Sequence, residues 1–369
     1  MSLSRIGGFR IAGVATCVPA AIASNADLGS RYGEVEVRKV VAMAGVRERR
    51  VADEGVTASD LCTEAAADLL DRLGWARDSI TGLIFVTQSP DYFLPSGSCV
   101  IHHKLGLSDQ CAAFDLGLGC SGYPYGLYLA ACMLKGGGQQ RILLLHGETP
   151  SKFSTPDDHA TTLLFSDAGS ATALETSATA PDSFFALHTD GAGAEQLIIR
   201  GGAFRDRHPQ DPRHQYLQMD GAAIFNFTVK RVPALIHDTL NFAGLAAGDI
   251  DSFLFHQSNR FIMKHIAHKC GLPEARVPLI LEHFGNSGGP SVPLVLTQSL
   301  AQSLAAHTGD RLRVMMLGYG VGLSWGAALM ELDREMLVMH RDYAGAPAAA
   351  MVPPAAAPQA AHPGTAANA

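Results

Sequence analysis

The cysteine with the most reactive surroundings in the chain is Cys120, within the segment Asp115-Leu-Gly-Leu-Gly-Cys120-Ser-Gly-Tyr123. This pattern predicts the end of a strand, a tight glycine turn and the start of a helix. At a helix start the backbone N–H groups lack partners, and the helix dipole favours negative charge. Because the thiolate is the reactive form of cysteine, we expect the helix start to lower the pKa of Cys120, which would suit a nucleophile. A buried cysteine that only fills space is the structural alternative.

Two later segments carry side chains that could act with this thiol. His256-Gln-Ser-Asn259 directly follows an apolar strand pattern, so His256 is expected at a strand's carboxyl end, where α/β proteins gather their ligands. Asn286 lies in the glycine-rich segment Glu282-His-Phe-Gly-Asn286-Ser-Gly-Gly, ahead of a helical pattern. By position alone, the histidine could simply cap a strand, and the asparagine could simply stabilise a turn.

A glycine run, Gly318-Tyr-Gly-Val-Gly-Leu-Ser-Trp-Gly326, lies between two strand-like segments. Its structural interpretation is a tight hairpin. Its functional interpretation is a set of backbone N–H groups that are presented to an oxyanion.

The glycines around the cysteine also match a dinucleotide-binding pattern, Gly117-x-Gly119-x-x-Gly122, with Glu148 as a candidate ribose-binding acid. The pattern lies a third of the way along the chain, and its glycines flank a cysteine where a pyrophosphate would have to approach. A nicotinamide oxidoreductase is therefore the weaker alternative, and we expect no cofactor. Despite fifteen histidines, neither His-Glu-x-x-His nor paired Cys-x-x-Cys spacing occurs, so no metal site is expected.

Composition limits the class of protein. The chain has 369 residues, of which 47% are hydrophobic and 17% charged, which is typical of a compact fold with a large core. A net charge of −7 disfavours nucleic-acid binding. No apolar run of about 18 residues predicts a membrane span. The first residues do not resemble a signal peptide, so the seven cysteines are expected as reduced thiols in a cytoplasmic protein.

Short apolar runs alternate with longer helical patterns in both halves of the chain. Strands are expected at 80–87, 112–116, 141–146, 251–256, 313–318 and 326–332, and helices at 59–73, 121–134, 221–243, 259–270 and 291–306. Ser59 is the expected N-cap of the first helix. The helix at 121–134 is apolar on nearly every side, which predicts a central position. This alternation indicates an α/β fold with a duplicated core.

The sequence also indicates the boundaries between the parts of the chain. The segment 175–214 has weak periodicity and is expected to be a lid-like insertion or connecting structure. We expect an N-terminal half at 1–180 with the nucleophile, a C-terminal half at 181–335 with the histidine and asparagine, and a disordered tail at 336–369. From Ala344 onward the chain is rich in alanine and proline and lacks charged Lys, Arg, Asp and Glu.

Together, the four motifs resemble the thiolase superfamily, and most closely ketoacyl-acyl-carrier-protein synthase III. The similarity runs from about Gly13 to Glu331 and includes the segments Gly45-Val-Arg-Glu-Arg-Arg50 and Phe165-Ser-Asp-Ala-Gly169. The resemblance implies a five-layer αβαβα fold built from two related halves, and a homodimer.

The resemblance also implies roles for individual residues. Cys120 would accept an acyl group as a thioester, while His256 and Asn286 would stabilise the enolate formed when a malonyl-type extender loses carbon dioxide. The backbone N–H groups of Cys120 and Val321 would hold the tetrahedral oxyanion. Phe93 would reach the partner subunit's acyl pocket. A cationic helix face would dock the acidic carrier protein, and its candidate residues are Arg260, Lys264 and Lys269.

Several positions depart from the family pattern. Lys39, Met43 and His159 stand where the housekeeping enzymes carry the tryptophan and arginines that bind coenzyme A, and Val321 and Ser258 replace a usual glycine and alanine. The donor could therefore be an acyl-carrier protein or another thioester. These departures suggest a divergent member that serves secondary metabolism or cell-surface polysaccharide synthesis.

The resulting prediction is an acyltransferase that forms an acyl-Cys120 and performs a decarboxylative Claisen condensation. Two alternatives stay open. The acyl group could pass to an alcohol or amine without decarboxylation, or the chain could be a non-catalytic partner subunit of an active homologue.

Overall fold

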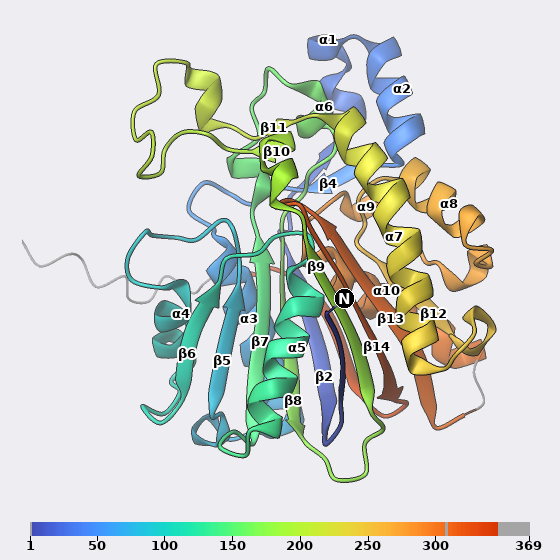
Figure 1. Cartoon of the computed structure of the whole chain (residues 1–369). Coiled ribbons are helices and arrows are strands. Elements are labelled where there is room, and N and C mark those ends of the chain that lie inside the picture. The colour runs from blue at the N-terminus through green and yellow to red at the C-terminus, as the bar shows by residue number, and fades with distance from the viewer. Residues whose placement is uncertain (1, 307–308, 346–369) are drawn as a thin grey trace, which may run out of the picture.

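Two large mixed sheets form the centre of the molecule in this computed structural model, which describes residues 2–306 and 309–345 (Figure 1). The first has the strand order β15-β2-β8-β7-β5-β6, and the second has the order β1-β9-β14-β13-β12. The strands of the first sheet are β15 (Leu337–Asp342), β2 (Phe9–Val18), β8 (Ala168–Thr176), β7 (Arg141–Glu148), β5 (Gly82–Val86) and β6 (Ala112–Leu116). Those of the second are β1 (Ser2–Ile6), β9 (Ser183–Thr189), β14 (Ser324–Asp333), β13 (Arg311–Gly320) and β12 (Ser252–Phe255).

Helices form three layers around these sheets. The helices α5 (Gly122–Lys135) and α10 (Ser291–Ala306) contact strands of both sheets, so they lie between them. The outer face of the first sheet carries α3 (Ala58–Leu73), against which α4 (Gly97–Leu105) packs, and the second sheet carries α7 (Gly221–Ala243), against which α8 (Arg260–Lys269) packs. This arrangement confirms the five-layer αβαβα fold that the sequence predicts. The apolar surface of α5 is explained by its place between two sheets.

The two sheets repeat one pairing pattern. Along β2-β8-β7-β5 the neighbours pair antiparallel, antiparallel and parallel, and along β9-β14-β13-β12 they pair in the same way. This repeat is the duplication that the alternating pattern predicted.

The chain termini do not keep to the predicted halves. β1 pairs with β9 of the second sheet, whereas β15 pairs with β2 of the first. The tail predicted at 336–369 therefore begins too early, because residues 337–342 form an ordered edge strand. The rest of that prediction, from residue 346, lies outside the described residues.

Most expected elements are found, two helices and one strand with the predicted bounds. The sequence patterns missed β2, β8 and β9. The strand β9 lies within the segment 175–214, which was expected to be a lid or a connection. β2 is rich in Gly, Ala and Thr, and β9 is only half buried, so neither shows a long run of large apolar residues. The predicted cap at Ser59 is also wrong, because Thr57 and Asp60 form the capping box of α3.

Small elements gather at one end of the sheets, above α5 and around the upper part of α7 in Figure 1. They are α1 (Gly29–Tyr32), α2 (Glu34–Ala44), α6 (His159–Thr162), α9 (Leu281–Phe284), the ribbon of β10 (Leu197–Ile198) and β11 (Gln218–Met219), and the pair β3 (Ile22–Ser24) and β4 (Glu48–Arg50). Short 3-10 helices occur at Asn25–Leu28, Arg77–Ser79, Pro150–Lys152, Gly191–Gln196, Pro212–Gln215, Ala247–Asp249 and Glu274–Arg276. Within the described ranges, no helix is long and apolar enough to cross a bilayer.

Packing of α3 on β8 requires a residue without a side chain at Gly169. A Cβ atom there would lie 2.6 Å from the backbone nitrogen of Cys62. We expect Gly169→Ala to destabilise the fold by about 1–3 kcal/mol, because overpacking must push the helix outward. The check is thermal unfolding beside Gly191→Ala, whose added Cβ meets nothing within 4 Å. Equal melting temperatures for the two variants would contradict this packing argument.

Candidate active site

Cys120 lies in the turn that joins β6 to α5. The backbone N–H of Gly122 donates to the Gly119 carbonyl at 2.8 Å, which closes the turn. A Cβ atom at Gly119 would lie 2.4 Å from Oε1 of Gln88, so a larger residue would have to displace the Gln88 side chain. The thiol is partly accessible, and it is held at the carboxyl end of the first sheet.

The hairpin between β13 and β14 closes over this thiol, as the structural interpretation of the glycine run predicted. A Cβ atom at Gly320 would lie 2.9 Å from the sulfur of Cys120, so the backbone itself faces the sulfur. The hydroxyls of Ser121 and Ser324 lie 2.6 Å apart and join the turn to the hairpin. The backbone N–H groups of Val321 and Cys120 both approach the sulfur and lower its pKa. Two backbone amides, one from each half of the chain, thus face the sulfur.

His256 follows β12 and is almost completely buried, with 2% exposure. Its backbone N–H donates to the Leu317 carbonyl at 2.7 Å, and its Nδ1 lies 2.8 Å from Oγ of Ser291. The ring of Tyr319 packs edge-on, with ring centroids 5.5 Å apart. Burial lowers the pKa of His256 to about 4. The imidazole is therefore neutral at physiological pH.

Asn286 occupies the turn between α9 and α10, and both ends of its amide are engaged. Its Nδ2 donates to the Ser258 carbonyl at 3.2 Å, and its Oδ1 accepts the Gly288 N–H at 2.9 Å. A parallel bridge to Phe165 ties the residue to the N-terminal half. One N–H of the amide remains available for another acceptor.

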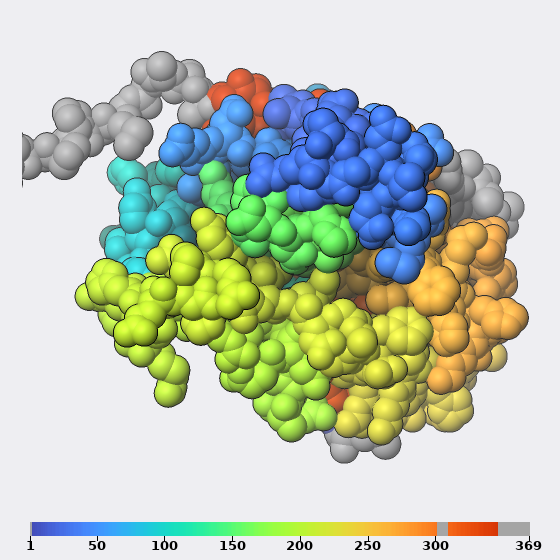
Figure 2. Space-filling view, turned by 90° about the horizontal axis from the view of Figure 1, so that it is seen from above, coloured from blue at the N-terminus to red at the C-terminus, as the bar shows by residue number. Residues whose placement is uncertain are grey.

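One cavity of about 500 Å³ is lined by Cys120, His256 and Asn286 together. It runs past residues of α2, α6, α7 and α8, and Figure 2 shows the surface hollowed where the segments of α2, α7 and α8 meet. Met43 and Phe261 line it and are more than half exposed, so they stand at its mouth. The three side chains that the sequence singled out thus meet in one open pocket.

A second cavity of about 400 Å³ also reaches Cys120 and Val321. Its lining is largely apolar, with Phe153, Phe165, Ile198 and Leu217 among its walls. Cys120 therefore stands where two cavities meet. Both cavities are largely apolar and open to the surface, and His256 and Asn286 line the one of about 500 Å³ but not the other.

The expected low pKa of Cys120 is wrong. Burial is the largest influence and raises the pKa of the thiol to about 11, and the Glu148 carboxylate raises it further. The nearby backbone N–H groups act in the opposite direction but do not outweigh the loss of solvation. Cys120 is a thiol, not a thiolate, at neutral pH.

Glu148 is a buried carboxyl that sequence reasoning noticed only as a ribose-binding candidate. It accepts hydrogen bonds from the Gln88 N–H and the Ser89 hydroxyl, both at 2.8 Å. Burial raises its pKa to about 8. Because both carboxyl oxygens already accept hydrogen bonds from the residues that follow β5, Glu148 does not fit the dinucleotide-binding interpretation. Its position at the end of a buried strand was the available sequence signal.

Phe93 does not reach the pocket of its own chain. It lies in the loop after β5, is 65% exposed, and packs on Phe204 with ring centroids 5.4 Å apart. Tyr92 and Leu94 beside it are also exposed. The loop therefore presents an apolar patch at the surface.

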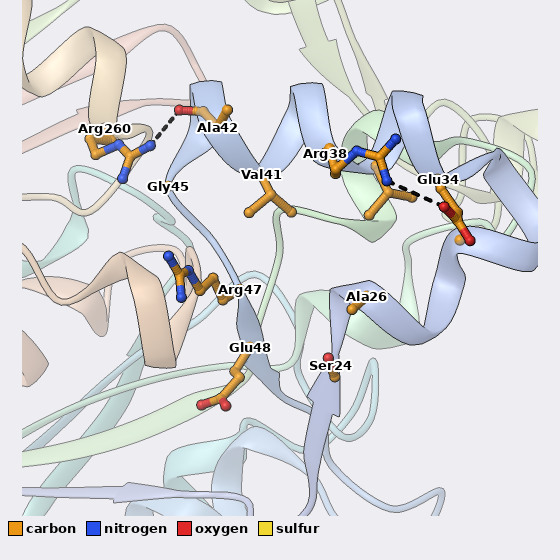
Figure 3. A pocket seen from close by; sticks show the side chains of 12 residues that line it. Ser24, Ala26, Glu34, Arg38, Val41, Ala42, Gly45, Arg47, Glu48 and Arg260 are labelled. Atoms are coloured by element: carbon orange, nitrogen blue, oxygen red, sulfur yellow. Dashed lines mark hydrogen bonds and ion pairs between the residues drawn. The ribbon is translucent and has the colours of Figure 1, made fainter.

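The predicted docking cations do not line the pocket that holds Cys120. Arg260 donates to the Ala42 carbonyl and lines a separate cavity of about 850 Å³ between α2 and β4 (Figure 3). Lys264 pairs with Glu274 at 3.3 Å, and Lys269 donates to the Val229 carbonyl at 3.0 Å. The three groups lie on α8, and each already has a partner.

Lys39, Met43 and His159 replace the residues that bind coenzyme A in the housekeeping enzymes, and these three positions lie near the pocket mouth. Glu36 and His159 line it, with a 3.8 Å contact between them. Lys39 pairs with the same carboxylate at 3.6 Å. No lysine or arginine belongs to the lining of the cavity, all of which lies in the described ranges. No group of three or more potential metal ligands occurs among the described residues either.

Alkylation of Cys120 by iodoacetamide should report its raised pKa. We expect the rate to keep rising with pH well above pH 9, with an apparent pKa of about 11. Glu148→Gln removes a negative charge that opposes the thiolate, so at pH 9 the variant should react ~3-fold faster, which equals about half a pKa unit. Asp109→Asn, at an exposed loop position, is the matched control. A plateau of the rate near pH 7 would show that the thiol is acidic after all.

The chain is similar to known condensing enzymes over nearly all of its length. Residues 114–194 match the family 3-oxoacyl-[acyl-carrier-protein] synthase III, and residues 240–332 match its C-terminal part. A Lactobacillus helveticus beta-ketoacyl-[acyl-carrier-protein] synthase III is 30% identical over 327 residues, which cover 88% of this chain and 98% of that protein. The solved 3-oxoacyl-(acyl-carrier protein) synthase of Burkholderia xenovorans is 42% identical, with a TM-score of 0.88 and coverage of 92% of this chain and 98% of that one. The priming beta-ketosynthase of the R1128 polyketide pathway is 27% identical, with a TM-score of 0.79 and coverage of 89% and 98%. This chain therefore belongs to the 3-oxoacyl-[acyl-carrier-protein] synthase III family, whose members are acyltransferases that condense acyl chains.

Proposed function

We propose that this chain loads an acyl group onto Cys120 as a thioester and condenses it with a malonyl-type thioester by decarboxylative Claisen chemistry. The observation that carries this proposal is the place of Cys120 between two cavities. We assign the acyl chain to the cavity of about 400 Å³, and the thioester arm and the extender unit to the cavity of about 500 Å³, because His256 and Asn286 line the latter and not the former.

In the first step, the Cys120 sulfur attacks the carbonyl carbon of an acyl thioester. The negative charge that develops on the carbonyl oxygen is held by the backbone N–H groups of Cys120 and Val321. The C–S bond of the donor then breaks, and the departing thiolate takes up the proton that the Cys120 thiol gives up. Because the thiol starts protonated, this proton transfer belongs to the same step as the acyl transfer.

In the second step, a malonyl-type thioester loses carbon dioxide and becomes an enolate. The enolate oxygen accepts hydrogen bonds from the His256 ring and from the free N–H of Asn286. Neutral donors suit this task because they stabilise charge as it develops and do not protonate the carbanion. The carbanion attacks the acyl-enzyme carbonyl and the new carbon–carbon bond forms. The C–S bond to Cys120 breaks, and the released thiolate takes up a proton from solvent, because its original proton left with the donor thiol.

The donor and the pathway are proposed from what lines the pocket mouth. Glu36 and His159 lie there, without arginines that would neutralise the phosphates of coenzyme A, which favours an acyl-carrier protein as donor. The similarity to a polyketide priming synthase supports a place in secondary metabolism, and surface-polysaccharide synthesis is the other pathway that we consider. Docking of the carrier on Arg260, Lys264 and Lys269 stays a prediction, as does the cytoplasmic location.

Substitutions at Cys120 and at His256 should have different effects on acylation and on decarboxylation. Cys120→Ala should show no acyl adduct by intact-protein mass spectrometry after incubation with acyl thioesters, whereas Cys99→Ala, which removes an exposed thiol, should label like the unmodified protein. His256→Ala should still be acylated but should lose malonyl decarboxylation by about 10²–10³-fold, the usual effect of removing one charge-stabilising donor.

The same measurements decide between the remaining alternatives. Acylation without malonyl-dependent carbon dioxide release would favour transfer to an alcohol or amine. Absence of both would identify a non-catalytic partner subunit. An undiminished adduct in Cys120→Ala would exclude the cysteine as the acyl acceptor.

We also propose a homodimer in which the exposed loop around Phe93 packs on a second copy and reaches its acyl cavity. An aromatic residue that is 65% exposed is costly in water and gains most from burial at an interface. Phe93→Asp should therefore weaken the dimer, measured as the mass in solution by light scattering. Phe242→Asp is the control, because Phe242 is 40% exposed on the outer helix α7. A monomeric unmodified protein would contradict the proposal.

A further inference from the structure

A serine hydroxyl lies directly behind the ring of His256. Ser291 is the first residue of α10, comes five positions after Asn286, and is completely buried. Its Oγ is 2.8 Å from Nδ1 of His256. The backbone N–H of Gln257 donates to the same oxygen at 3.1 Å. The hydroxyl thus contacts the ring at Nδ1, from the first residue of α10.

The Ser291 hydroxyl needs an acceptor for its proton. A hydroxyl has one proton to donate and two lone pairs, and Gln257 uses one lone pair. Among the described residues, no other side chain or carbonyl accepts from the Ser291 hydroxyl. If Nδ1 of His256 carried the ring proton, the hydroxyl proton would be left without a protein acceptor among the described residues, although the Ser291 side chain is completely buried. Such an unpaired buried donor is unfavourable.

The opposite arrangement satisfies every group. The Ser291 hydroxyl then donates to a bare Nδ1 and still accepts from Gln257. Because the imidazole is neutral, the ring proton must sit on Nε2. We propose that Ser291 is a positioning residue that holds His256 as the Nε2–H tautomer and so directs its one ring proton away from α10.

The Gly288 carbonyl is another polar group near the ring, and its proximity raises the pKa of His256. This carbonyl accepts the backbone N–H of Ser291 at 3.2 Å. The hydrogen bond that joins a ring nitrogen to a side chain is the one between Nδ1 and the Ser291 hydroxyl.

The tautomer matters for one partial reaction only, if the proposed function holds. Decarboxylation needs a donor at Nε2 for the enolate oxygen, and a bare Nε2 would present a lone pair to that charge. Acylation of Cys120 relies instead on the backbone amides. Loss of the serine should therefore reduce decarboxylation and leave acylation nearly unchanged, a division that a general loss of packing would not produce.

The first test reads the tautomer without any substrate. Long-range ¹H–¹⁵N correlation spectra of ¹⁵N-histidine-labelled protein distinguish a protonated from a bare ring nitrogen. The His256 signals are identified by their loss in His256→Asn. We expect Nδ1 bare and Nε2 protonated in the unmodified protein. A protonated Nδ1 in that spectrum would overturn the proposal, whatever the variants do.

The second test compares two serines of the same turn. Ser291→Ala should slow malonyl decarboxylation by about 10- to 100-fold and change Cys120 acylation less than about 3-fold. Ser287→Ala is the matched control, because this hydroxyl is also buried in the turn and has no partner among the described residues. It should leave both rates within about twofold. Equal losses in both reactions, or equal effects of the two variants, would reduce Ser291 to a packing residue.

The two tests separate this inference from the proposed function. If the unmodified protein neither becomes acylated nor releases carbon dioxide, the proposed function fails, yet the tautomer spectrum still decides the role of Ser291. If both reactions proceed and the spectrum shows a protonated Nδ1, the function stands and the inference fails.

Discussion

The site depends on the close approach of two backbone segments, the turn that carries Cys120 and the hairpin that carries Val321. A Cβ atom at Gly318 would lie 2.7 Å from the Cys120 carbonyl oxygen, and one at Gly320 would lie 2.9 Å from its sulfur. Only glycine allows such proximity. Since the first segment comes from the N-terminal half and the second from the C-terminal half, neither half can form the amide cradle alone. The two amides can therefore face the Cys120 sulfur only when the two halves are packed together.

This closeness sets the electrostatics of the site. Excluding water raises the pKa of Cys120 and lowers that of His256, so both groups are neutral in the resting protein. The resting protein therefore holds no thiolate–imidazolium pair, which avoids the cost of buried charge. In the proposed reaction, the fixed amides would act only on charge that the reaction itself creates.

The sequence predicted which residues meet in one pocket better than it predicted the strands that hold them. The residue order around Cys120, His256 and Asn286 was sufficient because each follows a strand or precedes a helix whose pattern is strong. β2 and β9 escaped because small and half-buried residues give weak periodicity, and β15 escaped because an edge strand needs little apolar surface. The pKa of Cys120 was mistaken for a different reason. A helix start is visible in a sequence, but the depth at which the rest of the fold buries it is not.

The duplication explains which residues each half contributes to the pocket. In each half, one helix lies between the sheets and leads into a strand that has a neighbour on both sides: α5 precedes β7, and α10 precedes β13. Both helices therefore begin at the same end of the molecule. The turns ahead of them touch, since a Cβ atom at Gly289 would lie 2.5 Å from the Gly119 carbonyl oxygen. The turn before α5 holds Cys120, and the turn before α10 holds Asn286 and, at its end, Ser291 behind His256. The duplicated arrangement thus brings a thiol and a carboxamide, one from each half, to two neighbouring helix starts.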